Sequence, residues 1–210
     1  MIHVLIADDH AVVRKGLVPI ASESREIELC GEASEYSSLM RLMREQACDV
    51  LLLDIAMPGK NGIDVLKVVH DQYPKTQVLI LSMYPEDQYA IRALKAGAAG
   101  YLTKDSAPER LVEAILMVAR GKKYITPKVA EMLATHLVTD TEGEPHESLS
   151  DREFQTMRLI ATGRQLSQIA VELALSPKTV SVYRARVLEK MQLKNNAEIT
   201  HYAIKHGLVE

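Results

Sequence analysis

Acidic, hydroxyl and ammonium side chains follow four apolar segments in the first half of the chain. They are Asp8 and Asp9 after Ile2–Ala7, Asp54 after Asp49–Leu53, Ser82 after Val78–Leu81, and Lys104 after Gly100–Thr103. Because an open parallel sheet binds its ligands at the carboxyl ends of its strands, we expect these side chains at one edge of a sheet. Carboxylates bind a hard divalent cation, and an ammonium and a hydroxyl can hold a phosphoryl group. The pattern therefore predicts a site that accepts phosphate on an aspartate.

Asp54 is the expected nucleophile, and Asp8 and Asp9 are expected to hold Mg²⁺ together with it. A carboxylate that attacks a phosphoryl donor gives an aspartyl-phosphate. This reaction needs neutralisation of charge more than covalent assistance, which explains a metal, a lysine and a hydroxyl around one aspartate. A turn at Met57-Pro58 is expected to lead into the next helix. Aspartates that merely cap helices would explain one of these residues, but hardly the whole set.

Short apolar segments alternate with amphipathic segments of helical length through residue 120. This alternation is typical of βα units around a parallel sheet. The expected strands are Ile2–Ala7, Ile27–Glu32, Val50–Asp54, Val78–Met83 and Gly100–Thr103, and the expected helices lie near His10–Ser22, Ser37–Gln46, Ile63–Gln72, Pro85–Ala96 and Pro108–Arg120. Leu51–Leu53 is apolar without alternation, as in a strand covered on both faces. We therefore expect an α/β fold with a doubly wound, five-stranded parallel sheet of the flavodoxin-like kind.

From Pro127 onward the chain is expected to be helical, apart from one polar segment. Residues 139–148 are acidic, contain Gly and Pro and lack apolar periodicity, as in an exposed linker. Capping signals predict helices from Pro127 to about Leu137, from Ser150 to Ala161, over Leu166–Leu173, over Pro177–Met191, and from Asn195 or Asn196 to before Gly207. We expect an α/β domain over residues 1–121, a linker helix and acidic linker over 122–148, and a small all-α domain over 149–210.

The segments Leu166–Leu173 and Pro177–Met191 form a candidate helix-turn-helix. A short turn between two such helices places the second helix in the major groove of DNA. Its expected phosphate-neutralising cations are Lys178, Arg184 and Arg186, its expected base-reading residues are Ser181, Val182 and Ala185, and Thr179 lies among them. The last 62 residues carry nine Lys and Arg against six Asp and Glu, a weak indication of a nucleic-acid partner. A plain helical bundle with a solvated basic face is the alternative that this pattern leaves open.

Two sets of motifs make the resemblance to a known family specific. The first set is Ala7–His10, Asp54–Gly62, Leu81-Ser82 and Gly97–Lys104. The second set is Leu149–Glu153, Ala161–Gly163, Ile169-Ala170, Ser176–Val180 and Lys190–Leu193. In these motifs the chain resembles two-component response regulators of the NarL/FixJ group, in which a receiver domain precedes a LuxR-type helix-turn-helix. The resemblance covers nearly the whole chain and implies a DNA-binding transcriptional regulator that is switched by phosphorylation from a cognate histidine kinase.

The resemblance also implies a role for each matching residue. Asp54 is implied as the phospho-acceptor. Mg²⁺ is implied to be bound by Asp8, Asp9, Asp54 and the backbone carbonyl of Ala56. The implied phosphoryl-binding and switch residues are Ser82, Lys104 and Tyr101.

Three positions depart from the family patterns. Met83 stands where many receivers have a small residue, and both it and Tyr84 are expected to crowd the phosphoryl group. Leu166 and Tyr183 replace a polar residue and a histidine that are common in the LuxR-type pattern. Neither of the latter changes removes a basic side chain, so DNA binding is still expected.

Dimerisation on DNA is expected to use the last helix, Asn196–His206. An apolar strip on this helix is larger than so small a domain needs for its core, and its residues are Ile199, Tyr202, Ala203 and Ile204. Related proteins read paired half-sites as dimers, so a homodimer on phosphorylation or DNA binding is implied. The alternative is that the strip simply covers the core of the other three helices.

Two other functional classes are alternatives to this hypothesis. A phosphatase with an aspartate nucleophile generally needs a second acid two residues later, where this chain has Ala56, and no cap domain is present. We therefore expect no turnover of an external substrate. A DNA-binding protein with a vestigial receiver is the other alternative, and the complete acidic set argues against it.

The sequence predicts a cytoplasmic protein without a membrane partner. No apolar run approaches the roughly 18 residues of a membrane span, and the N-terminus lacks the layout of a signal peptide. Cys30 and Cys48 match no metal-binding spacing and are expected to be core thiols.

Overall fold

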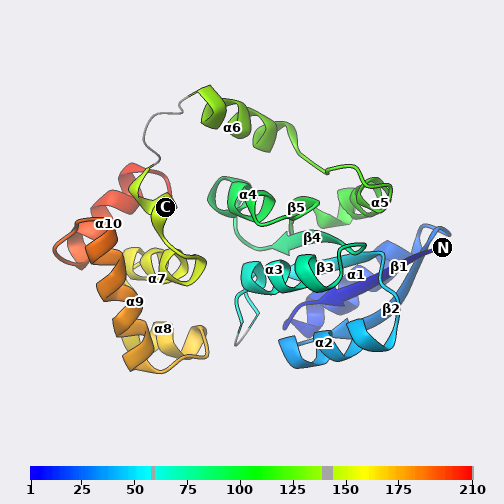
Figure 1. Ribbon diagram of the computed structural model, residues 1–210, viewed down its shortest axis with the longest axis horizontal. Coiled ribbons are helices and arrows are strands. Elements are labelled where there is room, and N and C mark those ends of the chain that lie inside the picture. Colours follow the sequence, from blue (N-terminus) through cyan, green and yellow to red (C-terminus); the bar gives the residue numbers. More distant parts are fainter. Residues whose placement is uncertain (58–59, 139–143, 210) are drawn as a thin grey trace. The chain divides into compact units, whose positions relative to one another are not determined.

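The computed structural model describes residues 1–57, 60–138 and 144–209 of the 210-residue chain. The chain divides into two compact units, Met1–His136 and Leu137–Glu210 (Figure 1). Pro58 of the expected turn at Met57-Pro58 lies outside the described residues, and so does the part of the acidic linker over residues 139–143.

A five-stranded parallel sheet with the strand order β2-β1-β3-β4-β5 forms the centre of the first unit (Figure 1). Its strands are β1 (Ile2–Ala7), β2 (Ile27–Ala33), β3 (Val50–Asp54), β4 (Gln77–Ser82) and β5 (Gly100–Thr103). The three leucines of β3 are at most 1% exposed, as expected for a central strand covered on both faces. The predicted doubly wound α/β fold is confirmed.

Five helices alternate with the strands of this sheet. They are α1 (Ala11–Ser22), α2 (Tyr36–Glu45), α3 (Gly62–Gln72), α4 (Glu86–Lys95) and α5 (Ala107–Ala119). Helix α1 contacts α5, and α3 contacts α4. The helices therefore cover both faces of the sheet. Gly121 lies just after the end of α5, where its φ of 75° suits glycine and its N–H donates to the carbonyl of Val118 at 2.9 Å.

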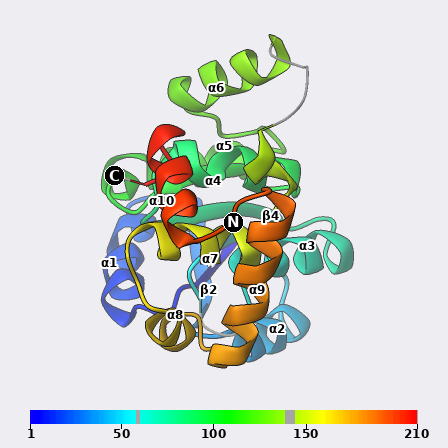
Figure 2. The ribbon, with the colours of Figure 1, turned by 90° about the vertical axis from the view of Figure 1, so that its left-hand side faces the viewer.

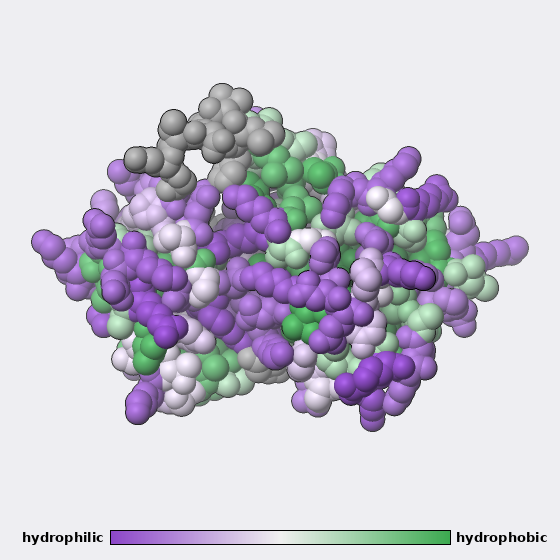
Figure 3. Space-filling model, viewed as in Figure 1, coloured by the Kyte–Doolittle hydropathy of each residue, from purple (hydrophilic) through white to green (hydrophobic). Residues whose placement is uncertain are grey.

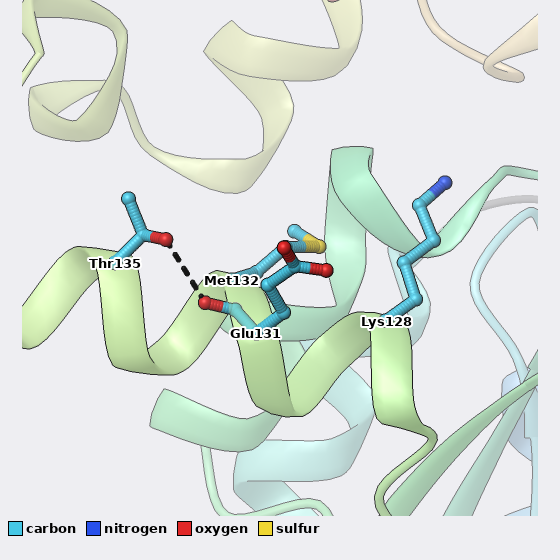
Figure 4. A pocket seen from close by; sticks show the side chains of 4 residues that line it. All are labelled: Lys128, Glu131, Met132 and Thr135. Atoms are coloured by element: carbon cyan, nitrogen blue, oxygen red, sulfur yellow. Dashed lines mark hydrogen bonds between the residues drawn. The ribbon is translucent and has the colours of Figure 1, made fainter.

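The expected linker helix is attached to the first unit. Helix α6 (Pro127–Val138) begins beside the first turn of α4. Thr126 Oγ1 donates to Glu86 Oε2 at 2.9 Å, and Lys128 Nζ lies 2.8 Å from Asp87 Oδ2. A shallow depression along α6 is lined by Lys128, Glu131, Met132 and Thr135 (Figure 4). The boundary between the two units therefore falls in the last turn of α6, between His136 and Leu137, whereas the sequence pattern predicts the end of the first domain at residue 121.

The second unit is helical, as the sequence predicts (Figure 2). Its elements are the 3-10 helix η1 (Pro145–Ser148) and the helices α7 (Asp151–Ala161), α8 (Leu166–Glu172), α9 (Pro177–Lys190) and α10 (Asn196–Lys205). The predicted capping box is present, because Ser150 Oγ accepts from the Glu153 N–H and the Glu153 carboxylate accepts from the Ser150 N–H. Buried side chains from all four α-helices meet in the core, among them Phe154, Ile169, Val180, Val187 and Ile199.

Candidate functional site

Lys104 joins two carboxylates at the carboxyl edge of the sheet. Asp8 directly follows β1, Asp54 ends β3, and both are 1% exposed. The ammonium of Lys104, which directly follows β5, lies 2.7 Å from Asp8 Oδ2 and 2.8 Å from Asp54 Oδ2. The parallel order of the strands places all three at one edge, although the sequence separates Asp8 from Lys104 by most of the first unit.

The serine predicted for this edge ends the strand between β3 and β5. Ser82 is the last residue of β4 and is fully buried. In the sheet register Asp54 pairs with Leu81, and Ser82 pairs with Thr103. The backbone N–H of Lys104 also donates to the Ser82 carbonyl at 2.8 Å. The register therefore places the hydroxyl one residue along β4 from the level of Asp54, at the same end of the sheet.

A cluster of oxygen and nitrogen ligands at this edge suits a divalent cation. One potential ligand atom from each of Asp8, Asp9, His10 and Asp54 lies within 4.8 Å of the others. Asp9 Oδ1 is buried and accepts no hydrogen bond from the described residues, and His10 Nδ1 lies 2.8 Å from it. Three carboxylates against one lysine leave an excess of negative charge, and Mg²⁺ prefers carboxylate oxygens and water. The residues therefore fit the predicted magnesium site.

His10 is closer to this cluster than the sequence suggests. The sequence pattern favours a simple helix-start residue, and His10 does precede α1 without capping it through its side chain. Its backbone N–H donates to Asp8 Oδ1 at 2.8 Å, and its exposed ring lies beside Asp9. The Ala56 N–H donates to Asp54 Oδ1 at 3.1 Å. The main chain thus orients two of the three carboxylates.

Burial and charge oppose each other at the pair of Asp54 and Lys104. Burial raises the pKa of Asp54 above its ordinary range, and the Asp8 carboxylate adds to this, while Lys104 acts in the opposite direction. Burial alone would lower the pKa of Lys104, but the neighbouring carboxylates outweigh burial and leave it raised. Lys104 therefore remains an ammonium, and the crowded carboxylates favour any further cation at the site.

Hydrogen bonds link Ser82 to Tyr101 through the loop before α4. The Tyr84 N–H donates to Ser82 Oγ at 3.1 Å, and the hydroxyl of the buried Tyr101 donates to the Tyr84 carbonyl at 2.8 Å. The Tyr84 ring stacks on Tyr89 of α4 with 5.0 Å between centroids. Met83 is 62% exposed, so in this conformation it does not pack into the interior. This exposure differs from the expectation that Met83 crowds the phosphoryl group.

The predicted DNA-binding residues occupy helix α9 after a tight turn from α8. Ser176 caps α9 by accepting from the Thr179 N–H at 3.0 Å, and Ala174 makes the turn with a φ of 52°. Lys178, Ser181, Val182, Ala185 and Arg186 are exposed, whereas Thr179 and Arg184 are partly buried. Hydrophilic side chains predominate on the face of the protein shown in Figure 3.

Two details of α9 were not visible in the sequence. Arg184 Nε donates to Asn196 Oδ1 at 2.6 Å, so this cation also joins α9 to the start of α10. A shallow depression on α9 is lined by Ser176, Lys178, Thr179, Val182, Tyr183 and Arg186. Tyr183, which the sequence pattern marked only as a departure, therefore belongs to the same surface as the expected DNA contacts.

The expected dimerisation strip on α10 needs correction at two positions. Ile199 and Ala203 are fully buried within the protein, so in this conformation they offer no surface to a second copy. Both side chains belong to the core of the helical unit. For these two residues the structure therefore agrees with the alternative that the strip covers the core of the other three helices. Ile204 is 58% exposed and Tyr202 is partly buried.

Tyr202 belongs to a polar and aromatic cluster that the sequence did not reveal. Its hydroxyl lies 2.9 Å from His146 Nδ1 and donates to Glu144 Oε2 at 3.3 Å. The ring of His206 stacks on Tyr202, with centroids 4.1 Å apart. Residues 144–148, expected to be part of the exposed linker, therefore pack against α10.

Comparisons with known proteins agree with both units. Residues 4–116 match the family described as "Response regulator receiver domain", and residues 147–203 match "Bacterial regulatory proteins, luxR family". The chain is 37% identical to the response regulator UvrY of Escherichia coli K12 over 99% of this chain and 96% of that one. It is 36% identical to the response regulator GacA of Pseudomonas aeruginosa PAO1 over 100% of this chain and 99% of that one.

Solved structures of similar proteins share the arrangement of elements. The RcsB response regulator of Salmonella typhimurium matches with a TM-score of 0.64 and 25% identity, over 97% of this chain and 100% of that one. An RcsB–DNA complex matches with a TM-score of 0.59 and 26% identity, over 100% of this chain and 99% of that one. None of the described helices is long and apolar enough to cross a membrane.

Proposed function

The chain belongs to the NarL/FixJ group of response regulators, and from this premise we propose that a histidine kinase phosphorylates Asp54 and thereby controls binding of the second unit to DNA. Members of this family are transcriptional regulators that bind DNA through a LuxR-type helix-turn-helix. The observation that carries the proposal is the position of the Lys104 ammonium, within 2.8 Å of both Asp8 and Asp54. A buried lysine between two buried carboxylates provides the charge that phosphoryl transfer to one of them requires.

The proposed transfer uses the Asp54 carboxylate as nucleophile. One of its oxygens forms the new P–O bond while the P–N bond to the kinase histidine breaks, and the electron pair leaves with the imidazole. Lys104 stabilises the negative charge on the equatorial oxygens of the phosphoryl group. Mg²⁺, when bound, supplies further neutralisation of these oxygens. Asp8, Asp9, Asp54 and the Ala56 carbonyl are the ligands that we propose for it.

We propose that the switch begins at Ser82. Its hydroxyl oxygen accepts the Tyr84 N–H in this structure. A phosphoryl group carries about 1.5 to 2 negative charges and offers strong acceptor oxygens. The Ser82 hydroxyl would donate to one of these oxygens, which changes the position of the loop that contains Tyr84. Because Tyr101 bonds to the carbonyl of Tyr84, its ring is expected to follow this change.

On the DNA side, α9 is the proposed recognition helix, and a homodimer is proposed to bind paired half-sites. Exposed Lys178 and Arg186 are suited to phosphates, and exposed Ser181, Val182 and Ala185 to base edges. Turnover of an external substrate is not part of the proposal. A phosphatase of the aspartate-nucleophile class would need an acid where this chain has Ala56.

Phosphorylation of the intact protein tests the assignment of Asp54. The protein is treated with a small phospho-donor and Mg²⁺, and the modified residue is located by mass spectrometry. We expect one added phosphate on Asp54, none in Asp54→Asn, and normal labelling of the control Asp105→Asn, which removes an exposed carboxylate close by. Efficient labelling of Asp54→Asn at another residue would contradict the assignment. Measurement of DNA affinity with and without beryllofluoride then tests the switch.

A further inference from the structure

Arg14 on helix α1 ties the first acidic loop to strand β2. Its Nη1 donates to the backbone carbonyl of Asp8 at 2.6 Å, and its Nε donates to Glu32 Oε2 at 3.1 Å. The Arg14 side chain is only 17% exposed. Neither Arg14 nor Glu32 belongs to the residues proposed above for metal or phosphate.

The carbonyl that Arg14 binds belongs to the peptide between Asp8 and Asp9. On the other side of Asp8, its N–H donates to the carbonyl of Ala33, the last residue of β2, at 3.0 Å. The backbone of Asp8 is therefore held at both of its polar groups. Because the orientation of a peptide group sets the direction of the next residue, the bond from Arg14 also constrains where the Asp9 carboxylate points.

Glu32 holds the same guanidinium through a second nitrogen. Arg14 uses two nitrogens of its planar guanidinium for two separate acceptors, one on the acidic loop and one on β2. A lysine has a single nitrogen on a flexible stem and cannot reproduce this geometry. Groups that orient metal ligands without touching the metal commonly change metal affinity by 10- to 100-fold when they are removed.

We infer that Arg14, held by Glu32, is a positioning residue that orients Asp8 and Asp9 for Mg²⁺. This inference rests on the proposed function, because it presupposes that these carboxylates hold the metal. Arg14 itself is a cation near the metal site. By Coulomb attraction and repulsion alone, its removal would strengthen Mg²⁺ binding. A positioning role predicts the opposite sign, and the experiment uses this difference.

The test is a Mg²⁺ titration of the full unphosphorylated chain, followed by NMR through the amide signals of Asp8 and Asp9. The variants are Arg14→Ala, Arg14→Lys and Glu32→Gln. The matched control is Lys15→Ala, which removes a neighbouring exposed cation of the same helix. We expect Mg²⁺ affinity to fall about tenfold in Arg14→Ala. We expect a smaller loss in Arg14→Lys and Glu32→Gln, and unchanged or slightly tighter binding in Lys15→Ala.

Phosphorylation kinetics provide the second measurement. The Mg²⁺ concentration for half-maximal labelling should rise in Arg14→Ala, while the rate at saturating Mg²⁺ stays close to that of the wild type. Mg²⁺ affinity that is unchanged or higher in Arg14→Ala overturns the inference. If Arg14→Ala fails to fold by circular dichroism, Arg14→Lys decides instead, because it keeps the positive charge and removes the two-acceptor geometry, so that unchanged affinity in this variant overturns the inference. Failure of the wild type to label Asp54 would instead overturn the proposed function, since the Mg²⁺ titration does not depend on labelling.

Discussion

Glu153 near the start of α7 and Lys190 at the end of α9 form an ion pair, with 2.6 Å between Oε2 and Nζ. The same oxygen of Glu153 accepts the Ser150 N–H at 2.8 Å. One nearly buried carboxylate therefore completes the capping box of α7 and joins α7 to the far end of the proposed recognition helix. The orientation of α9 within its unit depends in part on the charge of Glu153.

This ion pair predicts a pH dependence of stability. Burial alone would raise the pKa of Glu153, but its bonds to Lys190 and Ser150 outweigh burial and leave the pKa lowered. A carboxyl whose pKa is lower in the folded state contributes stability above its unfolded pKa, about 4.3, and loses it as the pH falls through the folded value. Glu153→Gln should therefore lower the free energy of unfolding by about 1–2 kcal/mol at pH 7 and by much less at pH 3.

Urea unfolding of the two proteins between pH 3 and pH 7 measures this difference. Glu189→Gln is the matched control, because Glu189 is an exposed residue next to Lys190. A constant difference between wild type and Glu153→Gln over the whole pH range would contradict the prediction.

Mg²⁺ should stabilise the first unit against heat. A ligand that binds only the folded state adds roughly 1.4 kcal/mol when its free concentration is about ten times its Kd. Asp9→Ala should remove most of this gain, because Asp9 Oδ1 is one of the oxygens of the cluster. Asp71→Ala removes a carboxylate from the exposed end of α3 and should leave the gain intact. Equal Mg²⁺-dependent shifts of Tm in Asp9→Ala and the wild type would exclude the proposed metal site.

Loss of the Tyr101 hydroxyl should loosen the loop before α4. Tyr101→Phe removes the bond to the Tyr84 carbonyl and should lower the free energy of unfolding by about 0.5–1.5 kcal/mol. Hydrogen exchange at the amides of residues 84–88 should become faster, while exchange in β1 stays unchanged. Tyr73→Phe, at the end of α3, serves as the control. Exchange that is equally slow in Tyr101→Phe and the wild type would show that this bond does not hold the loop.

Arg186 and Val182 should have separable effects on DNA binding. Arg186→Ala should weaken binding to specific and random DNA alike and reduce the slope of log affinity against log salt by about one. Val182→Ala should change the preferred sequence and leave that slope nearly unchanged. Because Arg184 is partly engaged by Asn196, Arg184→Ala should reduce the slope by less than Arg186→Ala. A change of sequence preference without loss on random DNA would show that Arg186 reads bases.

We propose that the exposed side of α10 forms the dimer contact. A substitution of Ile204 tests this proposal. This side chain is 58% exposed, so Ile204→Asp should leave the folded unit intact. It should weaken cooperative binding to paired half-sites by roughly tenfold, equivalent to about 1.4 kcal/mol, with little effect on a single half-site. Val171→Asp, a change of the same kind at an 83% exposed position of α8, is the control. Equal losses on single and paired half-sites would exclude a dimer contact at Ile204.

The sequence by itself determined the order and nearly the bounds of the described strands and α-helices, though not the 3-10 helix η1. Apolar runs without alternation, as at Leu51–Leu53, specify strands covered on both faces, and local capping signals, as at Ser150 and Ser176, specify where helices begin. The same strand-end pattern identifies Asp8, Asp54 and Lys104 as site residues from the sequence. These signals are readable because they depend on neighbours along the chain.

Only the tertiary structure decided which partners these side chains have. Ile199 and Ala203 have the periodicity of an apolar strip, but periodicity does not say whether a strip faces the core of its own unit or another protein, and packing placed both in the core. Arg14 and Glu32, 18 positions apart, meet only because β1 and β2 lie side by side in the sheet. Side-chain contacts between distant segments depend on the folded backbone, and the sequence therefore left them undetermined.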